Sequence, residues 1–293
     1  MTKLRGQLKH NISLADYTSW RVGGPAKTLY HPADKTDLIN FLQTVSATEP
    51  VIWLGLGSNT LIRDQGFNGT VIITQSTLDN LTQLSDTKLY AEAGTACAKL
   101  ARFSARLNLT GLEFMAGIPG TVGGALKMNA GCSGGETWTT VTSVQTINRC
   151  GKLFTHTPRD YDIHYRHVLG HDQEWFLGAE FTLKNEIPGT AQAKIKQLIA
   201  YRQETQPINF PSGGSVFRNP PHQYAAKLIE SCQLKGYTLG HAKISEKHAN
   251  FIINEGGATA ADIEALIHHI QATVKKQCHI ELIPEVHIYG DAA

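Results

Sequence analysis

Two polar residues of this chain have neighbours that favour chemistry at a bound ligand. Ser215 follows two glycines inside a segment rich in proline and glycine, residues 207–221, so a ligand could approach the backbone and the hydroxyl could donate a proton. Arg166 follows Tyr165, and its planar guanidinium suits a carboxylate or an enolate. The structural alternatives are a turn serine, which the local sequence favours, and an internal ion pair.

Glu285 is an acid inside an otherwise apolar stretch, residues 282–288. Burial of a carboxylate is costly unless the group is paired or protonated, so this position could hold a neutral acid. Pro284, directly before it, suits an edge strand, where Glu285 would instead face solvent. Functional roles for Ser215, Arg166 and Glu285 therefore need support from other parts of the sequence.

Two glycine-rich loops indicate a ligand. The first follows the predicted buried strand 51–54 and offers Gly55, Gly57, Ser58 and Asn59. The predicted ligand-binding positions of the second loop are Gly117, Ile118, Pro119, Gly120, Thr121, Gly123 and Gly124. So many glycines disfavour a core element, whereas bare amides and a hydroxyl suit the phosphates of a dinucleotide. Neither loop completes the G-x-G-x-x-G or the G-x-x-x-x-G-K-[ST] pattern, so we predict a nucleotide-like ligand bound without either common motif.

Periodicity predicts the elements that must position these loops. Strands are expected at 26–30, 51–54, 71–74, 88–93, 141–147, 153–157, 175–183 and 280–288. Helices are expected at 35–45, 96–107, 191–203 and 224–232, and after a capping box that begins at Thr259. This order divides the chain into three regions, at 1–82, 83–188 and 189–293, of which the first is a small α/β unit.

Composition excludes several classes of protein. The chain has 293 residues, 41% of them hydrophobic and 18% charged, and its net charge of +2 gives no sign of a nucleic-acid or membrane surface. Five cysteines without a C-x-x-C pair argue against a disulfide framework and a zinc site, and fit a reducing cytoplasm. We therefore expect a cytoplasmic protein with no metal. The oligomeric state stays open, with a monomer favoured.

Taken in order, segments along the chain resemble the UDP-N-acetylenolpyruvoylglucosamine reductase (MurB) family in its shorter form. The matching segments are 18–24, 54–61, 111–124, 128–131, 165–166, 214–220, 248–254 and 284–286. Each motif is weak alone, but the ordered set covers nearly the whole chain and is specific.

The resemblance implies a fold and a cofactor. Residues 1–82 and 83–188 would form two subdomains of an FAD-binding fold of the vanillyl-alcohol-oxidase (PCMH) type, and 189–293 an α+β substrate-binding domain whose last strand returns Glu285 to the active site. FAD would be bound non-covalently by the two glycine loops.

The resemblance also implies a reaction in peptidoglycan precursor synthesis. NADPH would reduce the flavin, and hydride would pass from flavin N5 to the methylene carbon of the enolpyruvyl group on UDP-N-acetylglucosamine. Ser215 would supply the proton, Arg166 and Glu285 would stabilise the enolate-like charge, and Asn219 and Tyr165 would contact the substrate. A serine can act as the acid only if the carbon is strongly basic and water is excluded.

Some positions depart from the family pattern and keep alternatives open. Val168 stands where the family often has serine, and Cys132 follows the Asn-Ala-Gly motif, where it could lie near the flavin or simply pack. A flavin oxidase of the same fold, with flavin attached to Cys132 or His31, is one alternative. A non-catalytic nucleotide-sugar or flavin-binding module is the other.

Overall fold

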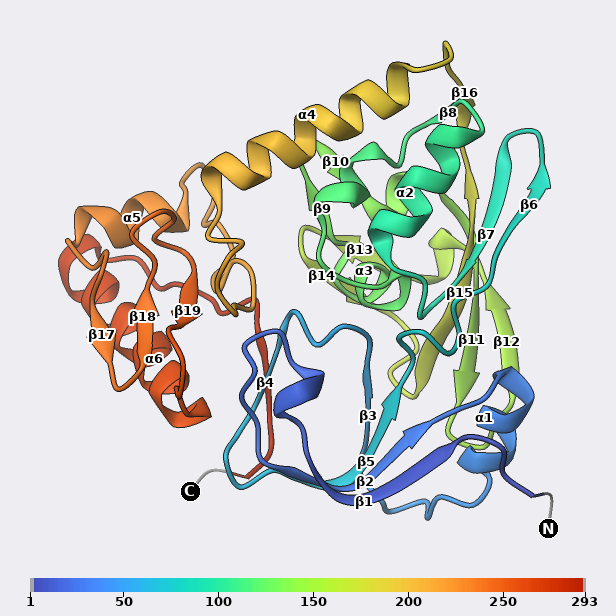
Figure 1. Ribbon diagram of the computed structural model, residues 1–293, viewed down its shortest axis with the longest axis horizontal. Helices are drawn as coiled ribbons and strands as arrows, with labels where there is room; N and C mark the ends of the chain where they lie inside the picture. Colours follow the sequence, from blue (N-terminus) through green and yellow to red (C-terminus); the bar gives the residue numbers. More distant parts are fainter. Residues whose placement is uncertain (1–2, 292–293) are drawn as a thin grey trace. The chain divides into compact units, whose positions relative to one another are not determined.

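The computed structural model describes residues 3–291 and divides into two compact units, each assembled from separate stretches of chain (Figure 1). Unit 1 comprises Met1–Lys9, Thr28–Leu56 and Gly69–Tyr201. Unit 2 comprises His10–Lys27, Gly57–Asn68 and Arg202–Ala293. The three predicted domains remain a prediction, since one compact unit can contain two subdomains.

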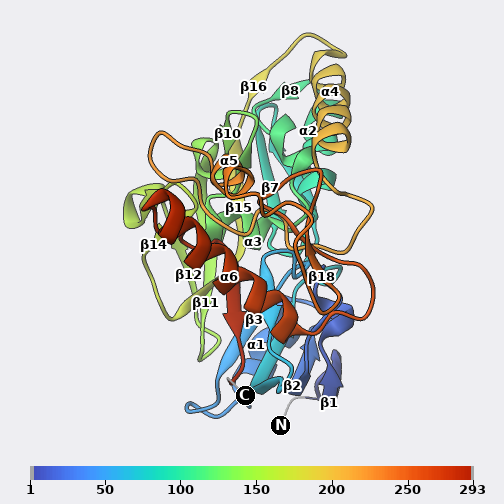
Figure 2. The same cartoon turned by 90° about the vertical axis from the view of Figure 1, so that its left-hand side faces the viewer.

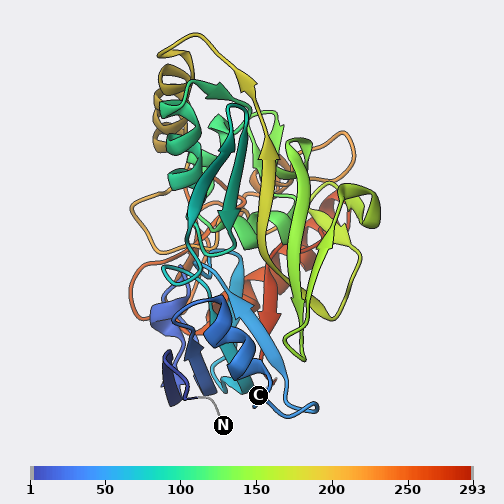
Figure 3. The same ribbon diagram turned by 90° about the vertical axis from the view of Figure 1, so that its right-hand side faces the viewer.

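Unit 1 is built on a five-stranded antiparallel sheet with the strand order β12-β11-β15-β7-β6, whose strands lie side by side in Figure 3. These strands are β6 (Leu81–Ser85), β7 (Lys88–Glu92), β11 (Val141–Asn148), β12 (Leu153–His156) and β15 (Glu174–Thr182). Alternate residues such as Leu89, Val144 and Phe181 enter the same apolar core as the helices α2 (Cys97–Arg106) and α3 (Val122–Met128). This core supports the second glycine loop, which runs directly into α3.

A four-stranded sheet has the order β1-β2-β5-β3, from β1 (Gln7–Ser13), β2 (Pro25–His31), β3 (Val51–Leu54) and β5 (Phe67–Ile73). The chain passes from one unit to the other within β1, β2 and β5. In unit 1, β3 runs parallel to β5, and α1 (Lys35–Leu42) buries Leu38 and Phe41 against Tyr30. The first glycine loop begins where β3 ends.

Unit 2 has a small antiparallel sheet, β17-β18-β19, formed by Thr238–Leu239, Ala242–Ile244 and Ile252–Asn254. The helices α5 (Ala225–Ser231) and α6 (Ala260–Cys278) share a core with it, and α6 is the long red helix of Figure 2. The predicted apolar face of α6 is buried, and its predicted capping box at Thr259 is present. Trp20 is fully buried and donates its indole N–H to the carbonyl of Ile252 over 2.7 Å, which ties an N-terminal segment to the sheet.

The shorter elements complete the chain. They are β4 (Thr60–Ile62), β8 (Leu109–Thr110), β9 (Gly131–Cys132), β10 (Gly135–Glu136), β13 (Asp162–His164), β14 (His167–Leu169), β16 (Lys184–Asn185), α4 (Thr190–Thr205) and β20 (His287–Tyr289). In the part of the chain that the structure describes, no helix has both the length and the apolar character needed to cross a bilayer.

Two sequence predictions of secondary structure are wrong. The predicted strand 280–288 is reduced to β20, which pairs in parallel with β4, because Pro284 has no N–H for a continuous ladder and makes only an isolated bridge with Phe217. The second glycine loop is not wholly irregular, since α3 includes Gly123 and Gly124. A Cβ on Gly123 would lie 2.9 Å from the Ala93 Cβ, so glycine lets this helix pack directly on the chain beyond β7.

The carboxylate of Asp64 stabilises the start of α6, because it accepts hydrogen bonds from the amides of Ala260 and Ala261, both at 2.9 Å. A negative charge at a helix N-terminus is favourable. We expect Asp64→Ala to lower the stability of unit 2 by about 1–2 kcal/mol, as for loss of a helix cap. The unfolding midpoint in urea, followed by Trp fluorescence, measures this, and Asp64→Asn, which keeps one acceptor, should lose less. Equal losses in both variants would contradict the capping role.

Candidate active site

In unit 1 the first and second glycine loops lie against each other. A Cβ added to Gly55 would overlap the Thr121 hydroxyl oxygen, so only glycine fits at this point. The Thr121 hydroxyl is buried, and among residues 3–291 it has no hydrogen-bond partner. Thr121 precedes the first residue of α3, and its side chain does not cap that helix. A buried hydroxyl without a partner is costly, and such an atom indicates a ligand that accepts or donates there.

The second loop uses part of its backbone internally. The amide of Ile118 donates to Met115, that of Val122 to Thr95 and that of Gly123 to Ala93, at 2.8–3.1 Å. These three amides already donate hydrogen bonds within the protein, so only the other amides of the loop can donate to a phosphate. Gly124 differs from its neighbour, since it is exposed and an added Cβ would meet nothing closer than 3.9 Å.

These observations fit FAD. The pyrophosphate of a dinucleotide needs hydrogen-bond donors and close access to the backbone, and the Thr121 hydroxyl and the open face of Gly124 offer both. Glycine at position 55 lets the two loops approach each other, so that donors from both can face one ligand. The loops of unit 1 would hold the cofactor through these groups.

The remaining predicted residues of the first loop belong to unit 2. Gly57 adopts a left-handed backbone (φ 64°), and a Cβ there would overlap the carbonyl of Tyr17. The side chain of Asn59 donates to the carbonyl of Glu285 at 3.0 Å, and the amide of His287 donates to the Asn59 carbonyl at the same distance. Asn59 therefore attaches the loop to the segment that carries the candidate acid. Its neighbour Ser58 is half-buried.

Arg166 occupies the second position of a two-residue turn between β13 and β14, a hairpin that the sequence patterns did not predict. Its backbone is left-handed (φ 56°), which is uncommon for a long side chain and is found disproportionately at functional sites. The guanidinium donates to the carbonyls of Asn129, at 3.3 Å, and Gly131. It also lies 4.8 Å from the ring centroid of Tyr165, which is 45% exposed. The hairpin thus presents Arg166 and Tyr165 together.

Asn129 holds the Arg166 hairpin to the end of α3; the sequence analysis included it in the matching segment 128–131 but gave it no role. It ends the helix in a left-handed conformation (φ 40°), as asparagine after a helical run often does. Its side-chain amide donates to Glu136 at 3.0 Å and to the carbonyl of His164 at 3.2 Å. The side-chain oxygen accepts from the amide of Trp138 at 3.2 Å. Buried and multiply bonded, Asn129 connects the glycine loop to the arginine.

Cys132 packs beside the second glycine loop. Its thiol donates to the carbonyl of Phe114 at 3.1 Å, and a Cβ on Gly117 would lie 3.2 Å from its sulfur. Ser133 and Gly134 then form the left-handed turn between β9 and β10, which accounts for the small residues after Cys132.

Ser215 lies on a strip of unit 2, residues 213–218, that is held by hydrogen bonds on both sides. On one side, the buried Asn250 accepts from and donates to the backbone of Phe217, at 3.0 and 2.8 Å, and its own carbonyl accepts from Val216. Gly213 packs on the ring of Trp20, where any side chain would overlap. Gly214 is left-handed (φ 73°) and open, so the approach to the half-buried Ser215 is lined by bare backbone.

The Glu285 segment borders the same strip on its other side. The amide of Glu285 donates to the carbonyl of Val216 at 2.7 Å, and the amide of Arg218 donates to Ile283 at 3.0 Å. Ser215 and Glu285 are therefore brought close through adjacent backbone. Glu285 is half-buried rather than on a solvent-facing edge. The side chain of Asn219 accepts from the amide of Ala225 at 3.0 Å, so part of its role is to hold the start of α5.

The 3-10 helix Glu113–Gly117, directly before the second glycine loop, is anchored by Glu113. The Glu113 side chain is 3% exposed and accepts from the Thr110 hydroxyl at 2.6 Å and the Gly111 amide at 2.9 Å. Burial opposes its ionisation, but these hydrogen bonds, with Lys194 at 3.9 Å, outweigh burial and lower the pKa of the Glu113 carboxyl.

The lowered pKa predicts acid sensitivity. Because the folded protein favours the carboxylate, this stabilisation is present above the unfolded pKa and is lost as pH falls through the folded value. We expect Glu113→Gln to be less stable than the parent by about 1.5–3 kcal/mol near pH 7, and the difference to shrink between about pH 5 and pH 3. Unfolding midpoints across that range measure it. A difference that is constant with pH would contradict an ionised Glu113.

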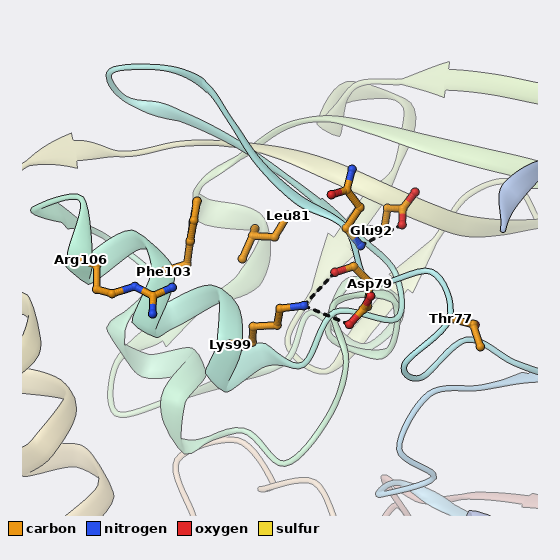
Figure 4. A pocket seen from close by; sticks show the side chains of 8 residues that line it. Thr77, Asp79, Leu81, Glu92, Lys99, Phe103 and Arg106 are labelled. Carbon is orange, nitrogen blue, oxygen red and sulfur yellow. Dashed lines mark hydrogen bonds and ion pairs between the residues drawn. The ribbon is translucent and has the colours of Figure 1, made fainter. Parts of the chain in front are cut away.

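A pocket of about 480 Å³ lies elsewhere in unit 1, between α2 and β6–β7 (Figure 4). Lys99 reaches the Asp79 carboxylate at 3.0 Å, and Phe103 and Arg106 follow on the same helix. The residues that line this pocket include none of the predicted site residues. Its acidic and basic groups are balanced, so we do not assign it to the active site.

Comparison with known proteins shows which families the two parts of this chain match. The family description "FAD binding domain" matches residues 26–157, and the description "UDP-N-acetylenolpyruvoylglucosamine reductase, C-terminal domain" matches residues 206–289. A protein of Legionella pneumophila (strain Corby) named UDP-N-acetylenolpyruvoylglucosamine reductase is 58% identical over 293 residues, 100% of this chain and 95% of that protein. One of the same name from Nitrosococcus oceani is 50% identical over 99% of this chain and 97% of its own length.

A solved structure shows the same fold. The crystal structure of UDP-N-acetylenolpyruvylglucosamine reductase from Thermus caldophilus matches with a TM-score of 0.81 and 30% identity, over 98% of this chain and 99% of that one. The fold and the two matched domains define an FAD-binding flavoprotein oxidoreductase, as the sequence predicted. With relatives above 50% identity over almost the full length, the chain belongs to the UDP-N-acetylenolpyruvoylglucosamine reductase family.

Proposed function

We propose that this enzyme uses NADPH to reduce the enolpyruvyl ether of UDP-N-acetylglucosamine to the lactyl ether of UDP-N-acetylmuramate. The observation that carries the proposal is the full-length relationship to reductases named for this substrate, 58% identical in the first case. FAD held by the two glycine loops would supply the hydride chemistry that links oxidation of NADPH to reduction of the methylene carbon of the substrate.

The residues of this chain have separate tasks in the proposal. Ser215 donates its hydroxyl proton to the carbon next to the carboxylate, and the open backbone at Gly214 supports such an approach. Arg166 stabilises the negative charge that develops on the carboxylate side, because a guanidinium binds an enolate in the geometry of a carboxylate. Glu285 stabilises the same charge as a neutral acid that donates a hydrogen bond, which requires protonation at neutral pH.

Substrate binding is assigned to Tyr165 and Asn219. The exposed ring of Tyr165 offers an apolar surface beside Arg166. Asn219 already accepts one bond from Ala225, and its amide N–H groups suit the acceptors of a sugar nucleotide. Donors for the cofactor come from the two glycine loops, with the Thr121 hydroxyl the clearest because it is buried without a protein partner within residues 3–291.

An anaerobic titration tests the proposal. The purified protein, loaded with FAD, should lose its visible flavin absorbance with NADPH and regain it with the enolpyruvyl UDP-sugar. Recovery with oxygen alone would instead identify an oxidase, and binding of FAD without reduction by NADPH would identify a binding module. The membership of the reductase family favours the first outcome.

A further inference from the structure

Two histidines and a glutamate meet at one end of the large sheet of unit 1. His156 is the last residue of β12, Glu174 is the first residue of β15, and His171 lies in the turn that leads into β15. The turn is closed by the Glu174 amide, which donates to the carbonyl of His171 at 3.1 Å. One potential ligand atom from each residue lies within 4.8 Å of the other two. None of the three belongs to the active site described above.

The distances are close to those of a metal site. His156 Nε2 lies 2.8 Å from one Glu174 carboxylate oxygen, and His171 Nδ1 lies 3.9 Å from the other. Tetrahedral zinc holds nitrogen and oxygen ligands at about 2.0–2.2 Å, which places neighbouring ligand atoms about 3.3 Å apart. With one ligand atom from each residue, all three atoms lie within 4.8 Å of one another, so a movement of about 1.5 Å or less brings each pair to this separation.

One side chain has to turn for the ligands to converge. The rings of His156 and His171 stack with centroids 3.9 Å apart and planes at 15°. The lone pairs of the ring nitrogens lie in these two nearly parallel planes, so they do not point at one common cation. The side chains of His156 and Glu174 are only 13% and 12% exposed, whereas that of His171 is 38% exposed. His171 can rotate toward a cation while the other two ligands stay in place.

The surroundings supply what a metal site needs beyond its ligands. The Thr146 hydroxyl donates to the same Glu174 oxygen that His156 Nε2 contacts, and this bond orients the carboxylate, as supporting hydrogen bonds do for metal ligands.

Tyr161 provides a second, independent observation that favours a bound polar group beside the two histidines. Its ring lies edge-on to both histidines, at centroid distances of 5.9 and 5.5 Å. Its hydroxyl is buried, and in the described range it has no hydrogen-bond partner. A water on a metal would give this hydroxyl a partner.

We propose that His156, His171 and Glu174 form a binding site for a divalent transition metal, with zinc the best match to two nitrogens and one carboxylate oxygen. The fourth position is left to water. The sequence patterns predicted no metal, because the spacing from His156 to His171 matches no common zinc motif and only the pairing of β11 with both β12 and β15 brings the ligands together.

The test uses the full-length protein freed of metal by chelation and then titrated with zinc chloride. We expect one zinc per chain that survives dialysis, a rise in the unfolding temperature with zinc, and the visible bands of tetrahedral cobalt when cobalt(II) replaces zinc. His171→Ala should lower zinc affinity at least about 100-fold, since removal of a ligand exceeds the 10–100-fold loss typical of its supporting partners. His171 is the most exposed ligand and has the longest contact, so this variant should keep its fold.

His10→Ala, at an exposed histidine of β1, is the matched control and should bind zinc as the parent does. Glu174→Gln provides a second test, since it keeps the side-chain shape and removes the charged ligand. Equal zinc binding in the parent, His171→Ala and Glu174→Gln would mean an adventitious ion only and would overturn the proposal. Absence of tight binding in the parent would overturn it as well, leaving the cluster as an ion pair with a stacked histidine.

Discussion

Ser215→Ala is expected to leave reduction of the bound flavin by NADPH unchanged and to slow its reoxidation by the enolpyruvyl UDP-sugar about 10²–10⁴-fold. That range is the usual contribution of a positioned general acid. The hydroxyl is the only group removed, and the strip that carries it is held by backbone contacts of Val216 and Phe217 that alanine does not disturb. Anaerobic stopped-flow absorbance separates the two half-reactions.

A serine a few residues away provides the control for this prediction. Ser212 takes part in the fold through its backbone, in a bridge with Ile253 and as the acceptor of the Ser19 hydroxyl at 2.6 Å. Ser212→Ala should therefore reoxidise at the parental rate. If Ser215→Ala reoxidised as fast as Ser212→Ala, the proton would have to come from another group, and the proposed role of Ser215 would be lost.

Gly124→Ala is expected to weaken FAD binding without weakening the protein. Inside a helix, alanine is more stable than glycine by about 0.5–1 kcal/mol, and the added Cβ would touch only the Thr121 hydroxyl, at 3.9 Å. If the open face of Gly124 admits the cofactor, the methyl group overpacks that contact by about 1–3 kcal/mol, a loss of about five- to 150-fold in affinity. Flavin fluorescence titration of the apoprotein measures the affinity, and thermal unfolding of the apoprotein measures the stability.

Gly123→Ala separates a structural glycine from a ligand-facing one. Its Cβ would lie 2.9 Å from the Cβ of Ala93, so this variant should destabilise the apoprotein itself. Opposite signs of the two stability changes, with reduced FAD affinity for Gly124→Ala, support the proposed cofactor loop. Unchanged FAD affinity in Gly124→Ala would remove that residue from the binding site.

The elements with strong apolar periodicity could be predicted from sequence. The strands at 51–54 and 141–147, the helix at 96–107 and the helix after Thr259 were recognisable because each buries one continuous face against a core. The helix α3 was missed, because its two glycines lower local helix propensity and only contact with Ala93 explains them. The hairpin β13–β14 was missed because each of its strands has only three residues, too few for alternation to stand out in the sequence.

The residues of the candidate site could be proposed from the sequence, but the tertiary contacts that join them could not. Glycine content and the family resemblance identified the loops and the residues Ser215, Arg166 and Glu285, whose roles remain predictions. The left-handed backbone of Arg166 and its anchoring through Asn129 depend on contacts between residues more than 30 positions apart. So does the attachment of Asn59 to Glu285, separated by 226 positions, because such tertiary hydrogen bonds leave no local pattern in the sequence.

The parallel pairing of β4 with β20 affects how this protein folds during its synthesis on the ribosome. Unit 2 takes strand β4 from residues 60–62 and its parallel neighbour from residues 287–289, so β4 cannot be paired in this way until residues 287–289 have left the ribosome. At about 5–20 residues per second, β4 waits about 10–45 s. During that interval Trp20 and Leu61, both fully buried in the finished unit, lack the C-terminal core that covers them. Nascent chains should therefore depend on chaperones that shield apolar segments until residues 287–289 have emerged.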